Sequence, residues 1–417
     1  MAAAAVVGVV PAVLLPGLLK GNGTADGDAG GKGGGTAQPS ASASAAARNA
    51  AGAVVIPGAD SGHTGDFGAV AADLSTRPDG WNAWRTTIAD GPVDCVLADA
   101  SLVCGGPRRI TVLDAANGKQ RWQTPPGEAA SGPASVAAVI GTTVCAFQDG
   151  FLVALGLADG AEQWREPLPD GVRVADSVES GGVLHYATKN TGTGAARVLA
   201  RELTGGHALK WDEPWSDPAA DAELAFADGR LVAVGDGITV LKGADGARLG
   251  SIGARDIACR TPVLTGKLLL CPGSDGLTVV EVTAPQNRRT IAAGVDIAYR
   301  PSFSRDGKVV VSSRTQTYAF ALADGRQYWA SYDGGEDMQT MGGTAVVGDK
   351  VFVVGEAGVD VLDLAAVGEA DAAGDPMTGW PEARDHPFDP ADVSLVAQGD
   401  VLFLGFPDGT VLSGFAP

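Results

Sequence analysis

The chain has 417 residues, which is long enough to bury one large hydrophobic core or two ordinary ones. It contains 60 glycines and 45% hydrophobic residues but only 6% aromatic residues, a composition that favours short apolar strands joined by tight turns. The formal charge of −19 would repel the phosphates of nucleic acids and of anionic lipids, so we expect no nucleic-acid partner.

Residues 1–20 form an apolar segment in which no charged residue precedes Lys20. As a helix this segment would be roughly 28 Å long, close to the thickness of the apolar core of a membrane. The positively charged start of a secretory signal is missing, so either the natural start lies upstream or the chain is part of a longer membrane protein. We expect residues 1–20 to be a membrane anchor or an uncleaved signal.

Residues 21–78 are rich in Gly, Ala, Ser and Thr, as in GDAGGKGGGTAQPSASASAAARNAAG. Such a segment cannot bury enough apolar surface to order itself, so we predict a disordered tether. Its flexible chain would reach roughly 40 Å from end to end. The ordered part of the protein is then expected at residues 79–417.

One phrase recurs along this part of the chain: an apolar run, a tight turn and a tryptophan. It reads ITVLDAANGKQRW at 110–122, FLVALGLADGAEQW at 151–164 and QTYAFALADGRQYW at 316–329, with a looser copy at 198–211. Asp-Gly and Asn-Gly pairs favour tight connections between antiparallel strands, because such turns need a positive φ. The apolar runs before and within each phrase predict three strands per repeat. A fourth strand is predicted to begin at the tryptophan.

The repeats return roughly every 40 residues, the spacing of a propeller blade with four strands. Positions near Gly250 and Thr290 fill the interval in which the tryptophan is missing. Counting the irregular Trp380 as a further repeat, we predict eight blades. Seven is the fallback, because residues 363–383 carry an insertion around Trp380. The regular tryptophans that mark the blades are Trp84, Trp122, Trp164, Trp211 and Trp329.

The two ends of the ordered part complete each other. The C-terminal residues 393–417 supply three strands but stop before a fourth, whereas residues 79–92 contain a tryptophan strand with no predecessors. Pairing the two would build the last blade from both chain ends and remove the free edges of the ring. The fold class we predict is therefore all-β, an eight-bladed β-propeller closed by its N- and C-terminal strands.

The repeated tryptophans and turn glycines are predicted to pack neighbouring blades together rather than to stack on a ligand. A tryptophan supplies a large apolar plate, and its indole N–H can donate to a backbone carbonyl. The residues to which we assign this docking role are Trp84, Gly118, Trp122, Gly160, Trp164, Trp211, Gly325 and Trp329.

Four of the five cysteines are predicted to form disulfides across hairpins. A two-residue loop at Asp99-Ala100 places Cys95 opposite Cys104 at a site without backbone hydrogen bonds, where Cα atoms are close. A three-residue loop ending in Gly266 would likewise place Cys259 opposite Cys271. Disulfides indicate an oxidising compartment. The alternative is that all five cysteines are small buried hydrophobic residues, as we expect for Cys145.

The phrase VLDAANGKQRW resembles the tryptophan-docking repeat of propellers of the pyrroloquinoline quinone (PQQ) type. That family includes quinoprotein dehydrogenases, the outer-membrane assembly lipoprotein of the β-barrel machinery, and extracytoplasmic sensor domains of actinobacterial receptor Ser/Thr kinases. The resemblance covers about residues 79–417 and is specific for the architecture, not for an activity.

A bound quinone is not expected. The quinoprotein enzymes need a disulfide between adjacent cysteines, calcium-binding carboxylates and a catalytic Asp, whereas this chain has no Cys-Cys pair and no room for their long insertions. The histidines His63, His185, His207 and His386 have no metal-binding spacing. We therefore predict no catalytic residue, no metal site and no cofactor.

Among function classes we favour a non-catalytic sensing or protein-interaction module outside the cytoplasm, anchored to the cytoplasmic membrane or secreted. Its partner would be a protein or a cell-wall ligand bound at one face of the propeller. The alternatives are a degenerate quinoprotein dehydrogenase and an assembly scaffold like the barrel-machinery lipoprotein, although residues 1–94 contain no cysteine for a lipid anchor.

Overall fold

The fold is all-β, with no α-helix among the residues described by this computed structural model. No helix in that part of the chain is long and apolar enough to cross a membrane, and nearly all of the predicted anchor and tether lies outside it. The described residues are 6–7, 83–89, 91, 94–98, 100–127, 133–215, 222–253, 257, 259–304, 307–331, 341–347, 350–355, 358–365, 368–370, 389, 392–398 and 401–415.

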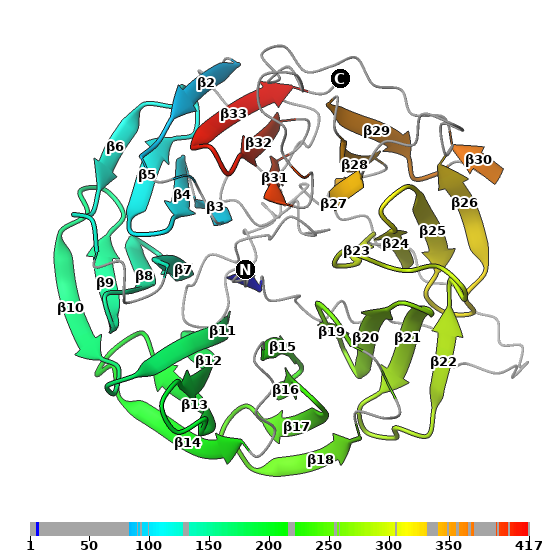
Figure 1. The fold of residues 1–417 in the computed structure, drawn as a ribbon, viewed down its shortest axis with the longest axis horizontal. Coiled ribbons are helices and arrows are strands. Elements are labelled where there is room, and N and C mark those ends of the chain that lie inside the picture. Colours follow the sequence, from blue (N-terminus) through cyan, green and yellow to red (C-terminus); the bar gives the residue numbers. More distant parts are fainter. Residues whose placement is uncertain are drawn as a thin grey trace, which may run out of the picture.

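Eight sheets surround a common axis, so the predicted eight-bladed propeller is confirmed (Figure 1). In each blade the first strand lies nearest the axis and the later strands follow outward to the rim. Blades 1 to 4 consist of β3 (Asp94–Ala98), β4 (Ser101–Gly105), β5 (Ile110–Asp114) and β6 (Gln120–Gln123); β7 (Ser135–Ile140), β8 (Thr143–Gln148), β9 (Phe151–Gly156) and β10 (Glu162–Pro167); β11 (Val172–Ser180), β12 (Val183–Asn190), β13 (Ala196–Glu202) and β14 (Leu209–Trp215); and β15 (Glu223–Ala227), β16 (Arg230–Val234), β17 (Ile238–Lys242) and β18 (Arg248–Ile252).

Blades 5 to 8 follow the same plan, apart from the region of the insertion. They consist of β19 (Val263–Thr265), β20 (Leu268–Gly273), β21 (Gly276–Glu281) and β22 (Arg288–Ile291); β23 (Ser302–Phe303), β24 (Lys308–Ser312), β25 (Thr317–Ala321) and β26 (Gln327–Ser331); β27 (Met341–Val347), β28 (Lys350–Gly355) and β29 (Val359–Asp363); and β31 (Ser394–Gln398), β32 (Val401–Gly405), β33 (Thr410–Phe415) and β2 (Trp84–Thr87).

Two short strands lie outside this plan. Within the described residues blade 7 has three strands, and the segment after it, β30 (Gly368–Ala370), pairs in parallel with the rim strand β26 of blade 6. Trp380, which we expected to open a fourth strand here, lies outside the described residues. The two-residue strand β1 (Val6–Val7) pairs in parallel with β11 near the axis.

Closure of the ring by both chain ends is confirmed. The strand β2 pairs antiparallel with β33, with Trp84 opposite Ser413 and Thr87 opposite Thr410. Blade 8 therefore takes its first three strands from the C-terminus and its rim strand from the beginning of the ordered part. This pairing leaves no gap between blades 8 and 1 (Figure 1).

The hydrophobic core lies between the blades and not at the axis. The buried apolar side chains form eight clusters, each of which contains residues from two neighbouring blades. The cluster between blades 1 and 2, for example, joins Val96 and Val112 to Val144 and Val153. Since every blade is covered on both sides, its inner strands are apolar on both faces, as the sequence shows for ITVLD and FLVAL.

Four of the repeated turns have the same hydrogen bonds. In each, the side chain of the Asp or Asn before the glycine accepts from the backbone N–H two residues on, and the glycine N–H donates to the carbonyl four residues back. The glycines have φ values between +69° and +76°, a conformation that a residue with a Cβ rarely adopts. They are Gly118, Gly160, Gly246 and Gly325.

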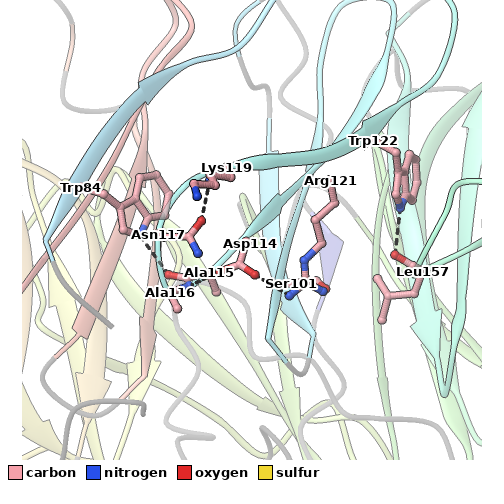
Figure 2. A network of polar contacts seen from close by, with 10 residues as sticks. All are labelled: Trp84, Ser101, Asp114, Ala115, Ala116, Asn117, Lys119, Arg121, Trp122 and Leu157. Carbon is pink, nitrogen blue, oxygen red and sulfur yellow. Dashed lines mark hydrogen bonds and ion pairs between the residues drawn. The ribbon is translucent and has the colours of Figure 1, made fainter. Parts of the chain in front are cut away.

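Each of these glycines also lies beneath a large apolar side chain of the preceding blade. A Cβ on Gly118 would lie 2.3 Å from the ring of Trp84, and a Cβ on Gly160 would lie 2.7 Å from the ring of Trp122. The indole N–H then reaches the same turn: Trp84 Nε1 donates to the Ala115 carbonyl at 2.9 Å, as Figure 2 shows. The turn glycine is therefore required for its backbone conformation and for the space that it leaves.

The same docking contact recurs with variations around the ring. Trp122 Nε1 donates to Leu157 O at 2.8 Å and Trp211 Nε1 donates to Gly243 O at 2.9 Å. Trp164 instead packs against the ring of His207, with centroids 4.3 Å apart. Trp329 is fully buried, but its N–H has no partner among the described residues.

Where the tryptophan is missing, the strand remains. The expected positions near Gly250 and Thr290 do lie in the rim strands β18 and β22. At the second of these interfaces Ile291 fills the tryptophan's place, because a Cβ on Gly325 would lie 2.5 Å from its side chain. Gly325 therefore lies beneath an isoleucine and not beneath a tryptophan.

Both predicted disulfides are present, and Cys145 is a free buried thiol. Cys95 lies directly opposite Cys104 across a two-residue turn, with Cα atoms 4.1 Å apart. The register predicted for the second pair is wrong. Thr265 pairs with Leu268 across a two-residue turn, so Cys259 lies before the strand β19 and not within it.

The chain reaches the second disulfide by a bend. Thr261 has a positive φ of 42°, and the Arg260 N–H donates to the Pro272 carbonyl at 2.9 Å, which brings Cys259 back beside the strand β20. The Cα atoms of Cys259 and Cys271 are then 4.4 Å apart.

We predict that Gly160→Ala is more destabilising than Gly150→Ala. The two glycines have φ values of +69° and +76°, but only Gly160 lies beneath a ring, since nothing surrounds the Cβ position of Gly150 within 4 Å. The control, Gly150→Ala, should lower the free energy of unfolding by about 1–2 kcal/mol through backbone strain. Gly160→Ala should lower it by about 1–3 kcal/mol more, because the added methyl group overpacks against Trp122. Urea unfolding measures both. Equal losses in the two variants would contradict the docking contact.

Candidate functional site at the axis of the ring

The strands around the axis are joined by contacts between a polar side chain and the backbone of the next blade. Ser394 Oγ of blade 8 accepts a hydrogen bond from the Cys95 N–H of blade 1 at 3.2 Å. Ser302 Oγ of blade 6 donates to the Thr344 carbonyl of blade 7 at 2.9 Å. In both cases the side chain belongs to the first residue of an innermost strand. At these two junctions a small hydroxyl group therefore forms the hydrogen bond between neighbouring blades.

At the junction of blades 3 and 4 a carboxyl group within the innermost strand makes the corresponding contact. Asp176 in β11 is only 5% exposed. Its Oδ2 accepts from the Leu224 N–H of blade 4 at 2.7 Å, and its Oδ1 accepts from the N–H of Ser177 at 2.8 Å. The residue follows a bulge between Val174 and Asp176, which turns its side chain toward blade 4.

Burial raises the pKa of Asp176 to about 8, while the two backbone hydrogen bonds and the positive charge of Arg300 lower it. Burial is the largest of these causes, so the neutral carboxyl form predominates at pH 7. Among the described acidic residues, Asp360 is another whose pKa is raised by burial.

Arg300 lies two residues before β23 of blade 6, whereas Asp176 lies in β11 of blade 3. These blades are not neighbours in the ring (Figure 1), yet the positive charge of Arg300 lowers the pKa of Asp176. Its Nε and Nη2 atoms are buried and have no hydrogen-bond partner among the described residues. Leaving such donors unsatisfied costs about 1–3 kcal/mol, so an acceptor brought by a binding partner would be favoured.

Acidic residues lie near Tyr299, which directly precedes Arg300 in the chain. Burial raises the pKa of Tyr299 to about 12, the negative charges of Asp389 and Asp392 add to this effect, and the positive charge of Arg314 opposes it. Tyr299 precedes the inner strand of blade 6, and the two aspartates precede the inner strand of blade 8. The groups around Tyr299 and Arg300 thus include cations, a phenol and carboxylates, a set that can bind a polar group.

The other titratable groups of interest serve the blade interfaces. His185 packs against Phe226 with ring centroids 4.7 Å apart, and its Nε2 lies 3.2 Å from the Gly243 carbonyl. Burial lowers the pKa of His185 to about 4 and raises the pKa of Cys145 to about 12, so both side chains are uncharged at neutral pH. Within the described residues no three His, Cys, Asp or Glu side chains are grouped to hold a metal ion. His63 and His386 lie outside those residues.

The tryptophans and glycines that the sequence analysis selected lie at the blade interfaces. The disulfides lie in blade 1 and beside the strand β20 of blade 5. The analysis missed Asp176 and Arg300. The one available signal was a carboxylate within the strand VRVADSVES, and nothing in AYRPSF distinguishes its arginine.

Comparisons with known proteins agree with the geometry. The family model described as outer membrane protein assembly factor BamB matches residues 50–249, from within the predicted tether to blade 4. None of the curated proteins compared with the chain matches it.

Several solved structures have the same fold. BamB from Moraxella catarrhalis is 15% identical, with a TM-score of 0.52 over 82% of this chain and 98% of that one. Sqt1 from Saccharomyces cerevisiae is 11% identical, with a TM-score of 0.61 over 81% and 99% of the two chains. Quinohemoprotein alcohol dehydrogenase ADHIIG from Pseudomonas putida HK5 is 12% identical, with a TM-score of 0.53 over 80% and 76%.

At these identities the structural likeness shows the fold alone, and that fold is shared by an assembly factor and a dehydrogenase. Two clear copies of the phrase of turn and docking tryptophan, at 110–122 and 151–164, lie within the residues that the BamB model matches. The chain is an eight-bladed β-propeller whose residues 50–249 match the family model of the outer membrane protein assembly factor BamB.

Proposed function

We propose that this propeller is a non-catalytic module that senses a ligand or binds a protein, that it works outside the cytoplasm, and that residues 1–20 hold it at the membrane. One observation carries the binding role: Arg300 keeps two buried donors without acceptors near the axis. The partner would be a protein or a cell-wall ligand that presents a carboxylate or another acidic group to this guanidinium.

The two disulfides support the location outside the cytoplasm. One joins the inner strands β3 and β4 of blade 1, the other joins Cys259, before β19, to the strand β20 of blade 5, and both are buried or half-buried where a reductant reaches them poorly. Disulfides of this kind persist in oxidising compartments and are rare in the cytosol. The apolar segment 1–20 and the Gly-rich segment 21–78 then supply an anchor and a tether.

The first prediction concerns the compartment. When cells are lysed in denaturant with N-ethylmaleimide, only Cys145 should be alkylated, because the other four cysteines are paired. Intact-mass measurement before and after reduction counts the modified thiols. Alkylation of all five cysteines without reduction would place the protein in a reducing compartment and would refute the proposal.

The second prediction separates a binding module from a quinoprotein enzyme. We expect no heat when the full chain is titrated calorimetrically with PQQ, in the presence or absence of Ca²⁺, because the sequence has no pair of adjacent cysteines to form the cofactor cavity. Binding that is micromolar or tighter and depends on calcium would overturn the non-catalytic assignment.

The third prediction concerns Arg300. At pH 7 we expect Arg300→Met to raise the free energy of unfolding by about 1–3 kcal/mol, because it replaces unsatisfied buried donors with an apolar side chain of similar length. Removal of the Arg300 charge costs Asp176 little electrostatic stabilisation at this pH, because its pKa of about 8 leaves the carboxyl group mostly neutral. Above pH 8 the gain should shrink, because Asp176 then ionises without a neighbouring cation.

Chemical denaturation at pH 7 and at higher pH measures this effect. Arg85→Met in the rim strand β2 is the control, because Arg85 is exposed and should leave the free energy of unfolding nearly unchanged. A clear loss of stability in Arg300→Met at pH 7 would show that Arg300 has a partner within the fold. That result would remove the main support for a binding site at the axis.

A further inference from the structure

A second polar and apolar site lies away from the axis, where the rim of blade 3 meets blade 4. A cavity of about 170 Å³ opens between the strands β13 and β14 on one side and β17 and β18 on the other. For comparison, an engineered cavity of about 150 Å³ binds benzene. The residues that line it are Val198, Glu213, Pro214, Trp215, Thr239, Leu241, Gly246 and Arg248.

The cavity is a consequence of the docking turn described above. A Cβ on Gly246 would lie 2.8 Å from the ring of Trp211 and 2.9 Å from Glu213 Cγ, so this glycine leaves room for both side chains. Glu213 is thereby held over the turn of blade 4 and beside the cavity. The deeper lining is apolar, since Val198 and Leu241 are 1% and 5% exposed.

Trp215 lines this cavity and carries a buried donor that is not satisfied. Its side chain is 6% exposed, and its Nε1 is buried without a hydrogen-bond partner among the described residues. Two other rim tryptophans, Trp122 and Trp211, donate to backbone carbonyls of the next blade. A buried N–H without an acceptor costs about 1–3 kcal/mol, so an acceptor within the cavity would be stabilising.

The cavity also carries one charge of each sign. Arg248 and Glu213 line it but form no ion pair with each other, and Glu213 acts electrostatically on the nearby Arg197. A simple carboxylate would meet the positive charge of Arg248 but would be repelled by Glu213. A simple amine would be attracted by Glu213 but repelled by the positive charge of Arg248.

We infer that this cavity binds a small zwitterion, a free α-amino acid with an aliphatic side chain. The ligand's carboxylate would accept from Arg248 and from Trp215 Nε1, and its ammonium group would donate to Glu213. Its side chain would pack on Val198, Pro214 and Leu241. The inference rests on the proposed sensing role and gives that role a ligand class, but it uses residues remote from Arg300, so each proposal can fail without the other.

Isothermal titration of the full chain with L-leucine tests the inference directly. Two matched probes each lack one charged group: 4-methylpentanoate has no ammonium group and 3-methylbutylamine has no carboxylate. We expect L-leucine to bind and both matched probes to bind at least about tenfold more weakly, because each leaves one charged residue of the cavity without a partner. Equal affinity for L-leucine and either matched probe, or no binding of L-leucine at millimolar concentration, would overturn the inference.

Variants then assign the binding to this cavity. Trp215→Phe removes the N–H but keeps an aromatic ring, and Arg248→Gln removes the cation, so each should weaken L-leucine binding by about tenfold or more. Arg230→Gln, in the strand β16 of the same blade, does not line the cavity and should bind normally. Thermal unfolding checks that each variant is folded. Unchanged affinity in Trp215→Phe and Arg248→Gln would contradict this site.

Discussion

The structure depends on the contact between a rim tryptophan and the turn glycine of the next blade. No blade has a core of its own: each of the eight apolar clusters is shared between two neighbours, so a blade is stable only when both of its neighbours are in place. The glycine makes this sharing possible, because it closes a turn with positive φ and allows the indole to approach the backbone. The close packing between blades therefore depends on a short local sequence, the Asp-Gly or Asn-Gly turn and the tryptophan that docks on it.

The eight interfaces use the same position in different ways. Ile291 lies over Gly325, His207 packs against Trp164, and the N–H of Trp329 is buried without a partner among the described residues. Such tolerance explains why the repeat is clear in some blades and faded in others. It also explains why polar groups could be introduced between blades 3 and 4 without loss of the fold, since neighbouring interfaces hold the ring closed.

Features that repeat along the chain could be predicted from the sequence, whereas features that depend on one bend or on distant blades could not. The blade number, the closing strand and the docking residues follow from the spacing of Gly118, Trp122 and their copies. The register predicted around Cys259 was wrong because Thr261 bends the chain before β19, and no residue pattern in the sequence indicates that bend. Asp176 and Arg300 were missed because the charge of one acts on the other from a blade far away in the sequence.

Closure of the ring through β2 has a mechanical consequence. A pull on the residues before Trp84 acts first on this four-residue strand, which is held to β33 by one ladder of backbone hydrogen bonds and to blade 1 by the Trp84 indole. The segment that completes the ring is therefore also the point at which tension would first open it: a pull on the N-terminal side would peel β2 from β33 and withdraw the Trp84 indole from blade 1.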